Sequence, residues 1–216
     1  MRNDKIVKVT AVIIREEMYK EYDKLFTLFT KELGKIRAYA FGVRREHSKK
    51  IGMLRLFSFC EIELESSSDL YTIKDVHILD SLDDLSGDYD AMCYASYFAE
   101  LVDYCSFENM ESEDIFKLLY YTYKALIKNV IDKKLIKSIF ELKLLKYQGE
   151  YIESSALKED NESLRYTWDY CINSDIKDLY KFNLTDDLYK LFKDAVDSEF
   201  RLRINKKFKS LDKISL

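Results

Sequence analysis

Charged, aromatic and small side chains alternate between positions 35 and 41 of this 216-residue chain. Residues two apart in an extended strand point to the same face. The small apolar residues Ile36, Ala38 and Ala40 would share one face, which suits the interior of a tight barrel. The opposite face would combine two cations with two aromatic rings: Lys35, Arg37, Tyr39 and Phe41. Cations neutralise phosphates and flat rings stack on bases, so this pattern predicts a surface that binds single-stranded nucleic acid.

The loop after this strand adds five cations: Arg44, Arg45, Lys49, Lys50 and Arg55. Between positions 31 and 55 the chain has eight basic residues and two acidic ones. Such a cluster predicts salt-sensitive contact with phosphates without readout of the base sequence. The plainer interpretation is a solvated charged face, with Tyr39 and Phe41 packed beneath a second domain. The concentration of cations on one strand and its loop favours nucleic-acid binding.

A second basic cluster lies near the end of the sequence. Its cations surround the apolar residues Leu202, Ile204 and Phe208, and the candidates for binding are Arg201, Arg203, Lys206 and Lys207. Cations around apolar side chains could hold an acidic, hydrophobic peptide. The alternative is a helix end, where cations are favoured by the helix dipole, followed by a frayed tail.

Motifs for catalysis and for cofactors are missing from the sequence. The five glycines stand apart, so neither a P-loop nor a dinucleotide-binding fingerprint is present, and no H-E-x-x-H or G-x-S-x-G occurs. The four cysteines form no C-x-x-C pair and are expected to be buried, reduced thiols. We therefore expect a protein that is not an enzyme, with no catalytic residues, no cofactor and no metal.

The periodicity of the apolar residues changes once along the chain. Before residue 80 the patterns are short and strand-like, at 5–15, 22–30, 35–41, 56–64 and 70–78. After residue 85 they are helical, at 89–107, 114–129, 133–146, 163–171 and 185–203. Five short strands in so few residues predict a small barrel. We predict an α+β protein with two domains, residues 1–82 and 83–216, joined by a hinge at 81–88.

Charge is distributed unevenly between these two domains. The net charge of −4 combines +2 for residues 1–80 with −6 for residues 81–216. Positions 75–114 hold twelve acidic residues and no lysine or arginine. A basic patch beside an acidic stretch suggests an anionic partner at one end of the molecule. No apolar run approaches a signal peptide or a membrane helix, so we expect a cytoplasmic protein that does not bind membranes.

The order of several short motifs resembles the bacterial RecO family. In the strand-rich half they are AVIIR at 11–15, EYDKL at 21–25, FTKELGK at 29–35, AYAFGVRR at 38–45 and LRLF at 54–57. In the helical half they are ASYFAELVD at 95–103, FKLL at 116–119 and ELKLL at 141–145. The resemblance covers residues 5–149 and is weak beyond them.

The resemblance implies an N-terminal OB-fold, a C-terminal helical domain and a recombination mediator of the RecF pathway. Such proteins bind single- and double-stranded DNA, anneal complementary strands and help to load RecA onto strands coated by single-strand-binding protein (SSB). The implied partners are RecR and the acidic C-terminal tail of SSB, and a nucleoid-associated location follows. The rival interpretations are an OB-fold protein that binds RNA, and a non-catalytic interaction module whose basic face docks an acidic partner.

The sequence departs from the family in one respect. Many members carry four zinc-binding cysteines after the leucine-rich helix, whereas the corresponding region here has only Cys171. We therefore expect no zinc. Packing of five side chains should hold residues 150–180 instead: Tyr151, Leu157, Leu164, Trp168 and Tyr170.

Overall fold

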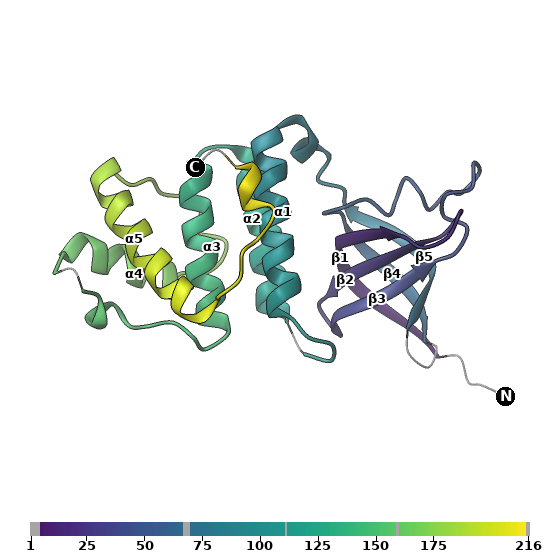
Figure 1. The fold of residues 1–216 in the computed structure, drawn as a ribbon, viewed down its shortest axis with the longest axis horizontal. Helices are drawn as coiled ribbons and strands as arrows, with labels where there is room; N and C mark the ends of the chain where they lie inside the picture. The colour runs from purple at the N-terminus through teal and green to yellow at the C-terminus, as the bar shows by residue number, and fades with distance from the viewer. Residues whose placement is uncertain (1–4, 67–69, 111, 159, 215–216) are drawn as a thin grey trace.

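The structure is a computed structural model that describes residues 5–66, 70–110, 112–158 and 160–214. A barrel lies at one end of an elongated molecule, and five α-helices extend away from it (Figure 1). This arrangement confirms the predicted α+β class, with the strands first and the helices after them.

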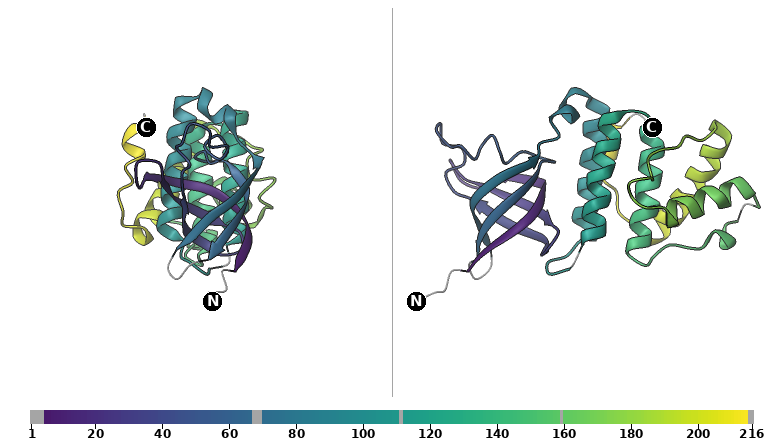
Figure 2. Two further views of the ribbon diagram at one scale, coloured as in Figure 1. Left: turned by 90° about the vertical axis from the view of Figure 1, so that its right-hand side faces the viewer. Right: turned by 180° about the vertical axis from the view of Figure 1, so that it is seen from behind.

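Five strands close into the barrel, whose end faces the reader in the left view of Figure 2. They are β1 (Ile6–Met18), β2 (Lys24–Thr30), β3 (Gly34–Ala40), β4 (Phe59–Ser66) and β5 (Tyr71–Asp80). Neighbours follow the order β1-β2-β3-β5-β4, and β3 pairs with β5 in parallel while the other pairs are antiparallel. This topology is that of an OB-fold, as the family resemblance implied.

The alternation in β3 is confirmed. Ile36, Ala38 and Ala40 are buried in the barrel core, which also contains Phe26 and Leu28. Small residues at these positions let the opposing strands approach closely.

Two strand boundaries differ by three residues from those expected, and the others differ by one or two at most. β4 begins at Phe59 rather than at residue 56, because Phe57 has a φ of 70°, which a strand does not accommodate. β1 runs on to Met18, because its last residues pair with the start of β2.

The helices match the predicted periodicity closely. They are α1 (Tyr89–Cys105), α2 (Glu113–Lys128), α3 (Lys133–Tyr147), α4 (Glu162–Asn173) and α5 (Asp186–Arg203). The side chains of Asp88 and Asn161 cap α1 and α4 by accepting hydrogen bonds from the backbone amides of Ala91 and Leu164. The expected hinge contains a short 3-10 helix, Asp83–Gly87, with Leu85 buried.

The barrel packs on α2 through aromatic rings. Phe59 of β4 lies with its ring centre 5.2 Å from that of Phe116 and 5.0 Å from that of Tyr120, both in edge-to-face geometry. Phe57 packs on Tyr123 in the same way. These residues belong to one apolar cluster that extends from the barrel into the helices, so the two domains share a core.

The region after α3 is held by packing, as expected. Leu157, Leu164 and Trp168 are buried, and the indole of Trp168 donates a hydrogen bond to the carbonyl of Ile152 at 3.0 Å. Tyr151 is half-buried against the core, and Tyr170 packs edge-to-face on a neighbouring phenylalanine. All four cysteines are also buried.

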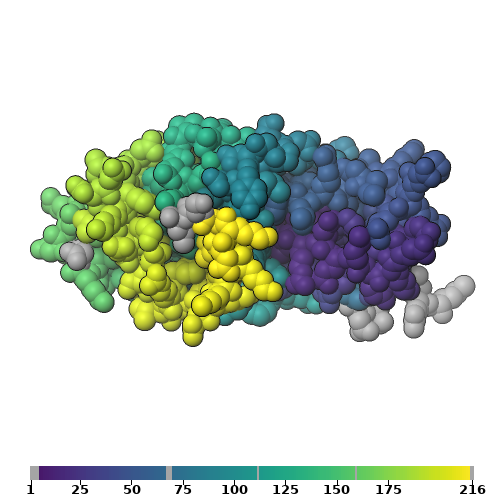
Figure 3. Space-filling model, turned by 45° about the horizontal axis from the view of Figure 1, so that its top comes forward, coloured from purple at the N-terminus to yellow at the C-terminus, as the bar shows by residue number. Residues whose placement is uncertain are grey.

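The segment that follows α5, residues 204–214, packs against α1. It is drawn in yellow across the middle of the molecule in Figure 3. Phe208 is buried against Tyr97 of α1, and the backbone amide and hydroxyl of Ser210 donate to the carboxylate of Glu100. The frayed tail considered above is therefore wrong for these residues. In the part of the chain that is described, no helix combines the length and apolarity needed to cross a membrane.

Candidate nucleic-acid interface

Three aromatic rings gather where the outer face of β3 reaches the tip of the barrel. Tyr39 and Phe41 stack with ring centres 5.6 Å apart and planes 24° apart. Tyr19, just beyond the end of β1, lies 4.6 Å from Tyr39. Phe41 is 54% exposed and Tyr19 is 46% exposed, so the rings offer faces to solvent. We call Tyr19, Tyr39 and Phe41 the ring cluster.

Sequence reasoning found two of these rings and missed Tyr19. The residue follows β1 by one position, and the hairpin register brings it beside β3, because Lys24 of β2 pairs with Ala40. The ammonium of Lys20 lies 5.3 Å from the Tyr19 ring centre and adds a cation there. A hydrogen bond with Tyr19 and burial raise the pKa of Tyr39, so its hydroxyl stays neutral at ordinary pH.

The cations beside the ring cluster come from the loop 41–58. Arg44 donates to the carbonyl of Glu21 at 2.8 Å, and the guanidinium of Arg45 lies 5.7 Å from the ring centre of Tyr22. These contacts tie the loop to the β1–β2 turn. Both arginines are exposed, as is Lys49. The charged groups of Arg44 and Arg45 therefore lie at the turn that also carries Tyr19, where an anion can reach them.

Two further predicted cations are partly engaged. Arg37, on β3, lies 3.9 Å from the carboxylate of Glu17, a loose pair that leaves its side chain 53% exposed. Lys50 donates to the carbonyl of Ile73 at 3.2 Å and is half-buried.

Lys35 and Arg55 lie away from the ring cluster, at the junction with the helices. The ammonium of Lys35 donates to the carbonyl of Asp103 and lies 3.1 Å from its carboxylate. Arg55 forms an ion pair of 2.9 Å with Asp83. Phosphate contact was predicted for both residues, but in the structure each has an acidic partner within the chain.

The same pairing explains much of the charge contrast along the sequence. Lys31 pairs with Glu113 at 3.1 Å, and Arg15 lies 3.9 Å from the carboxylate of Asp103. Basic residues of the barrel therefore face acidic residues of α1 and α2, so the helical domain itself supplies part of the negative charge that the sequence led us to expect in a partner.

The second basic cluster is also partly neutralised. Arg203 pairs with Glu199 and lies 3.9 Å from Glu150, while Arg201 lies 3.9 Å from Asp197. The remaining two candidates are exposed lysines: Lys206, whose ammonium lies 4.7 Å from the Tyr104 ring centre, and Lys207.

Comparison with known proteins assigns both halves of the chain. Residues 1–82 match the family described as "Recombination protein O N terminal", and residues 86–210 match "Recombination protein O C terminal". The chain belongs to the RecO family. Its fold and its motif order, noted above, agree with this assignment.

Curated relatives carry the same family name. A "DNA repair protein RecO" from Clostridium novyi is 37% identical over 144 residues, which is 67% of this chain and 56% of the relative. One from Clostridium kluyveri is 33% identical over the same shares. One from Thermoanaerobacter is 27% identical over 169 residues, or 77% of this chain and 68% of the relative. The matched part of this RecO-family chain thus spans little more than half the length of the first two.

A groove on the helical domain combines cations with rings, and we call it the lysine groove. It has a volume of about 750 Å³ and lies between α2, α3 and the end of α4. Its basic residues are Lys117, Lys143, Lys146 and Lys177, its rings are Phe116, Tyr120, Tyr121 and Tyr147, and its acids are Asp114 and Asp175. Sequence reasoning missed this set because the lysines come from separate elements and meet only in the fold.

Lys143 is the most unusual of these lysines. Its side chain is buried, and its ammonium donates to the carbonyls of Ile172 and Ser174, both at 2.8 Å. Burial lowers the pKa of Lys143 to about 8. Lys146 donates to the same Ile172 carbonyl at 2.7 Å, so two lysines provide hydrogen bonds to backbone carbonyls at the C-terminal end of α4.

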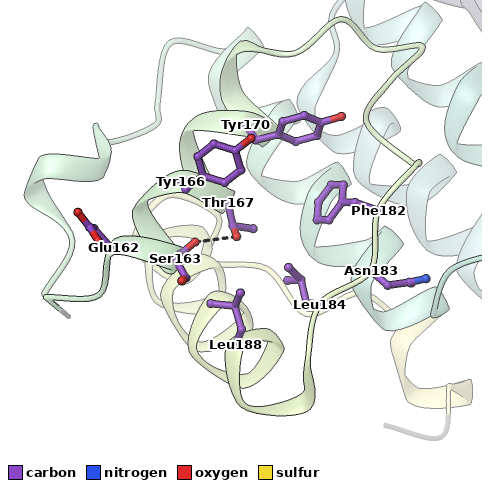
Figure 4. Close-up of a pocket in the computed structure, with 9 residues that line it drawn as sticks. All are labelled: Glu162, Ser163, Tyr166, Thr167, Tyr170, Phe182, Asn183, Leu184 and Leu188. Atoms are coloured by element: carbon purple, nitrogen blue, oxygen red, sulfur yellow. Dashed lines mark hydrogen bonds between the residues drawn. The ribbon is translucent and has the colours of Figure 1, made fainter.

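A second groove on this RecO-family chain is mainly apolar (Figure 4). It holds about 710 Å³ between α4 and the segment that leads into α5. Tyr166, Phe182 and Leu188 line it, and Glu162 is the charged residue at its edge. A groove with this lining offers no cation to an acidic ligand. Among the described residues, no three His, Cys, Asp or Glu side chains are grouped as metal ligands.

Proposed function

We propose that the protein is a DNA-binding recombination mediator in DNA repair, with its DNA-binding surface on the barrel. The observation that carries the proposal is the ring cluster, with the exposed cations Arg44 and Arg45 held at the neighbouring β1–β2 turn and the exposed Lys49 farther along the same loop. Stacked rings hold bases of any sequence, and cations hold the backbone. The relatives named DNA repair protein RecO support the same function.

The proposed activity is the pairing of complementary strands. Cations that neutralise the phosphates of two strands lower their mutual repulsion, so the strands can meet and pair. In the cell this activity would serve, together with RecR, to load RecA onto DNA coated by SSB. The annealing step needs no cofactor, because base pairing itself provides the driving force.

The test is fluorescence anisotropy of a labelled single-stranded oligonucleotide at several salt concentrations. Charge reversal of Arg44→Glu with Arg45→Glu should weaken binding and lower the salt slope by about 1.4, at about 0.7 per phosphate contact. The matched control reverses Lys158 and Lys190, which are both exposed. Lys190 belongs to α5, and Lys158 lines a pocket with residues of α4 and α5, at the end of the molecule away from the barrel (Figure 1).

Unchanged affinity and slope in the arginine double variant would overturn the barrel surface as the DNA site. Competition with unlabelled RNA of the same sequence tests the RNA-binding alternative. That alternative predicts that RNA displaces the labelled DNA at a lower concentration than unlabelled DNA does. Absence of nucleic-acid binding at low salt would favour the interaction module that docks an acidic protein.

For the acidic tail of SSB, we favour the lysine groove over the C-terminal cluster, because it is a concave site that combines lysines with four aromatic rings. Both sites are partly engaged within the chain. Lys143 and Lys146 donate to backbone carbonyls and Lys117 pairs with Glu113 at 2.8 Å, while Arg201 and Arg203 face carboxylates. Charge reversal of Lys117 and Lys177 should weaken binding of a labelled tail peptide more than charge reversal of Arg201 and Lys207. The opposite order would return the site to the C-terminal cluster.

A further inference from the structure

A crevice separates the barrel from the end of α1. It holds about 420 Å³, and its walls include Arg15 of β1, Arg37 of β3, Tyr71 of β5 and Phe107, which follows α1. Phe107 is 66% exposed although it lies at the junction of two packed domains. An apolar ring that is exposed to solvent in such a position offers a face on which a planar ligand can stack.

The position of Phe107 relative to β3 is fixed by backbone contacts. The amide of Lys35 donates to the Phe107 carbonyl at 3.2 Å, and the amide of Asn109 donates to the Leu33 carbonyl at 2.9 Å. Gly34 and Glu108 form an isolated antiparallel bridge between them. The wall of the crevice is therefore rigid before any ligand arrives, which lowers the entropic cost of binding.

Charges in the crevice nearly cancel. The cations Arg15, Lys35 and Arg37 are matched by the acids Glu17, Asp103 and Glu108. A phosphate would gain little there, because each cation has a carboxylate nearby. A nucleobase fits this lining better, since it is uncharged, has flat faces for Phe107 or Tyr71, and carries both donors and acceptors on its edge.

The crevice continues the ring cluster along one face of β3. That face carries Lys35, Arg37 and Tyr39, and Phe41 follows just beyond the end of the strand. The face therefore runs from the ring cluster at one end of β3 to the crevice at the other. Tyr39 and Lys35 are four residues apart, or about 13 Å at the rise of a strand. That distance corresponds to about four nucleotides of a stacked strand at about 3.4 Å each.

We propose that this crevice is a second base-binding subsite for the same DNA strand, with Phe107 as its stacking ring. The proposal rests on the proposed function, because it extends the strand that the ring cluster holds. Arg15 is held by Glu17 at 2.8 Å, whereas the pair of Arg37 with Glu17 is loose at 3.9 Å and leaves the Arg37 side chain 53% exposed. Arg37 is therefore the cation that contacts a phosphate between the two subsites, outside the crevice. The helical domain thereby takes part in DNA binding through one residue of its first interhelical loop.

The test compares three single variants of the full chain in binding a labelled single-stranded 20-mer. Phe107→Ala should lower affinity about fivefold or more, which is the loss expected when one stacked base loses its ring. Tyr39→Ala should lower affinity to a similar extent. Tyr166→Ala removes a ring of comparable exposure, 74% against 66% for Phe107, from the apolar groove and should leave affinity unchanged.

A second measurement uses the unaltered protein and does not depend on the stability of a variant. Photo-crosslinking of an oligonucleotide that carries 5-iodouracil should attach it to the peptide with Phe107 or Tyr71 as well as to the peptide with Tyr39.

The outcomes separate the two proposals. Loss of affinity in Tyr39→Ala but not in Phe107→Ala, with crosslinks at Tyr39 alone, overturns the crevice subsite and leaves the barrel surface in place. Unchanged affinity in both variants overturns the barrel surface as well. An equal loss of affinity in Tyr166→Ala would show that removing any exposed aromatic ring weakens binding, wherever the ring lies, and it would overturn the subsite.

Discussion

Lys35 of β3 and Asp103 of α1 are joined by an ion pair of 3.1 Å, and the Lys35 ammonium also donates to the Asp103 carbonyl. Arg15 approaches the same carboxylate at 3.9 Å. A single acidic residue of the helical domain therefore restrains two cations of the barrel face that we propose to bind DNA.

Asp103→Asn should strengthen DNA binding and weaken the fold slightly. Lys35 loses its carboxylate and becomes available to phosphates, whereas Arg15 keeps its ion pair with Glu17 at 2.8 Å. The salt dependence of binding should therefore become steeper by about one phosphate contact. The unfolding free energy should fall by no more than about 1 kcal/mol, since the pair is partly exposed. Anisotropy titrations and urea unfolding measure the two effects. Weaker binding with an intact fold would contradict the availability of Lys35 to DNA.

Gly34→Ala should destabilise the junction between the barrel and the helices. Gly34 has a φ of +65°, and an added Cβ would lie 2.4 Å from the carbonyl oxygen of Phe107 and 2.7 Å from that of Met110. Both atoms are backbone, so the loop must move, and we expect a loss of about 2 kcal/mol or more.

Gly52→Ala is the control for that variant. A Cβ at Gly52 would meet no atom within 4 Å. Thermal unfolding of the two variants should therefore differ by several degrees. Equal unfolding midpoints in the two variants would show that residues 107–110 can move to accommodate the added methyl group at little cost.

The ring of Tyr39, rather than its hydroxyl, should matter for DNA binding. Tyr39→Phe keeps the stack on Phe41 and should bind DNA nearly as well as the unaltered protein. Tyr39→Ala removes a stacking surface and should cost about 1–3 kcal/mol of binding free energy. Anisotropy at one salt concentration compares the two. A larger loss of affinity in Tyr39→Phe than in Tyr39→Ala would assign the role in DNA binding to the hydroxyl, which forms a hydrogen bond with Tyr19.

Lys143 should make stability depend on pH above neutrality. Its folded-state pKa of about 8 lies below the unfolded value, so between about pH 8 and 10.5 the unfolded chain binds more protons. The contribution of Lys143 to stability therefore rises with pH in that window. From pH 7 to 9 the unaltered protein should gain about 1 kcal/mol relative to Lys143→Met.

Other groups also contribute to the pH dependence of stability near this range, and their contributions must be subtracted. Burial raises the pKa of Cys105 to about 11 and that of Cys171 to about 12, so both thiols lower stability as pH rises. The charge of Lys143 lowers the pKa of Cys171, so both proteins should also carry Cys171→Ala, and the difference between their urea unfolding curves then isolates Lys143. A difference that stays constant from pH 7 to 9 would mean that Lys143 keeps its proton.

Local patterns were sufficient for the elements of this fold. The alternation in β3 predicted which side chains enter the barrel, and the 3.6-residue periodicity placed α1 to α5 within a few residues. Both are consequences of backbone geometry, which acts between near neighbours in the chain. Phe57 shows the limit, because a positive φ in a phenylalanine has no local signature and delays β4.

The candidate site needed both the sequence and the fold. Composition and spacing identified Tyr39, Phe41, Arg44 and Arg45 as one surface, because these residues are close in the chain. Tyr19 joins them only through the hairpin register, and the lysine groove assembles from three helices. Contacts between residues far apart in sequence depend on how the elements pack.

Charge shows the division most clearly. The sequence alone determined that a basic stretch and an acidic stretch exist, and the motif order pointed to the RecO family. The tertiary structure decided which cations remain available, because it places Lys35 beside Asp103 and Arg55 beside Asp83. Ion pairs form over a few ångströms in space, a distance that bears no relation to separation along the chain.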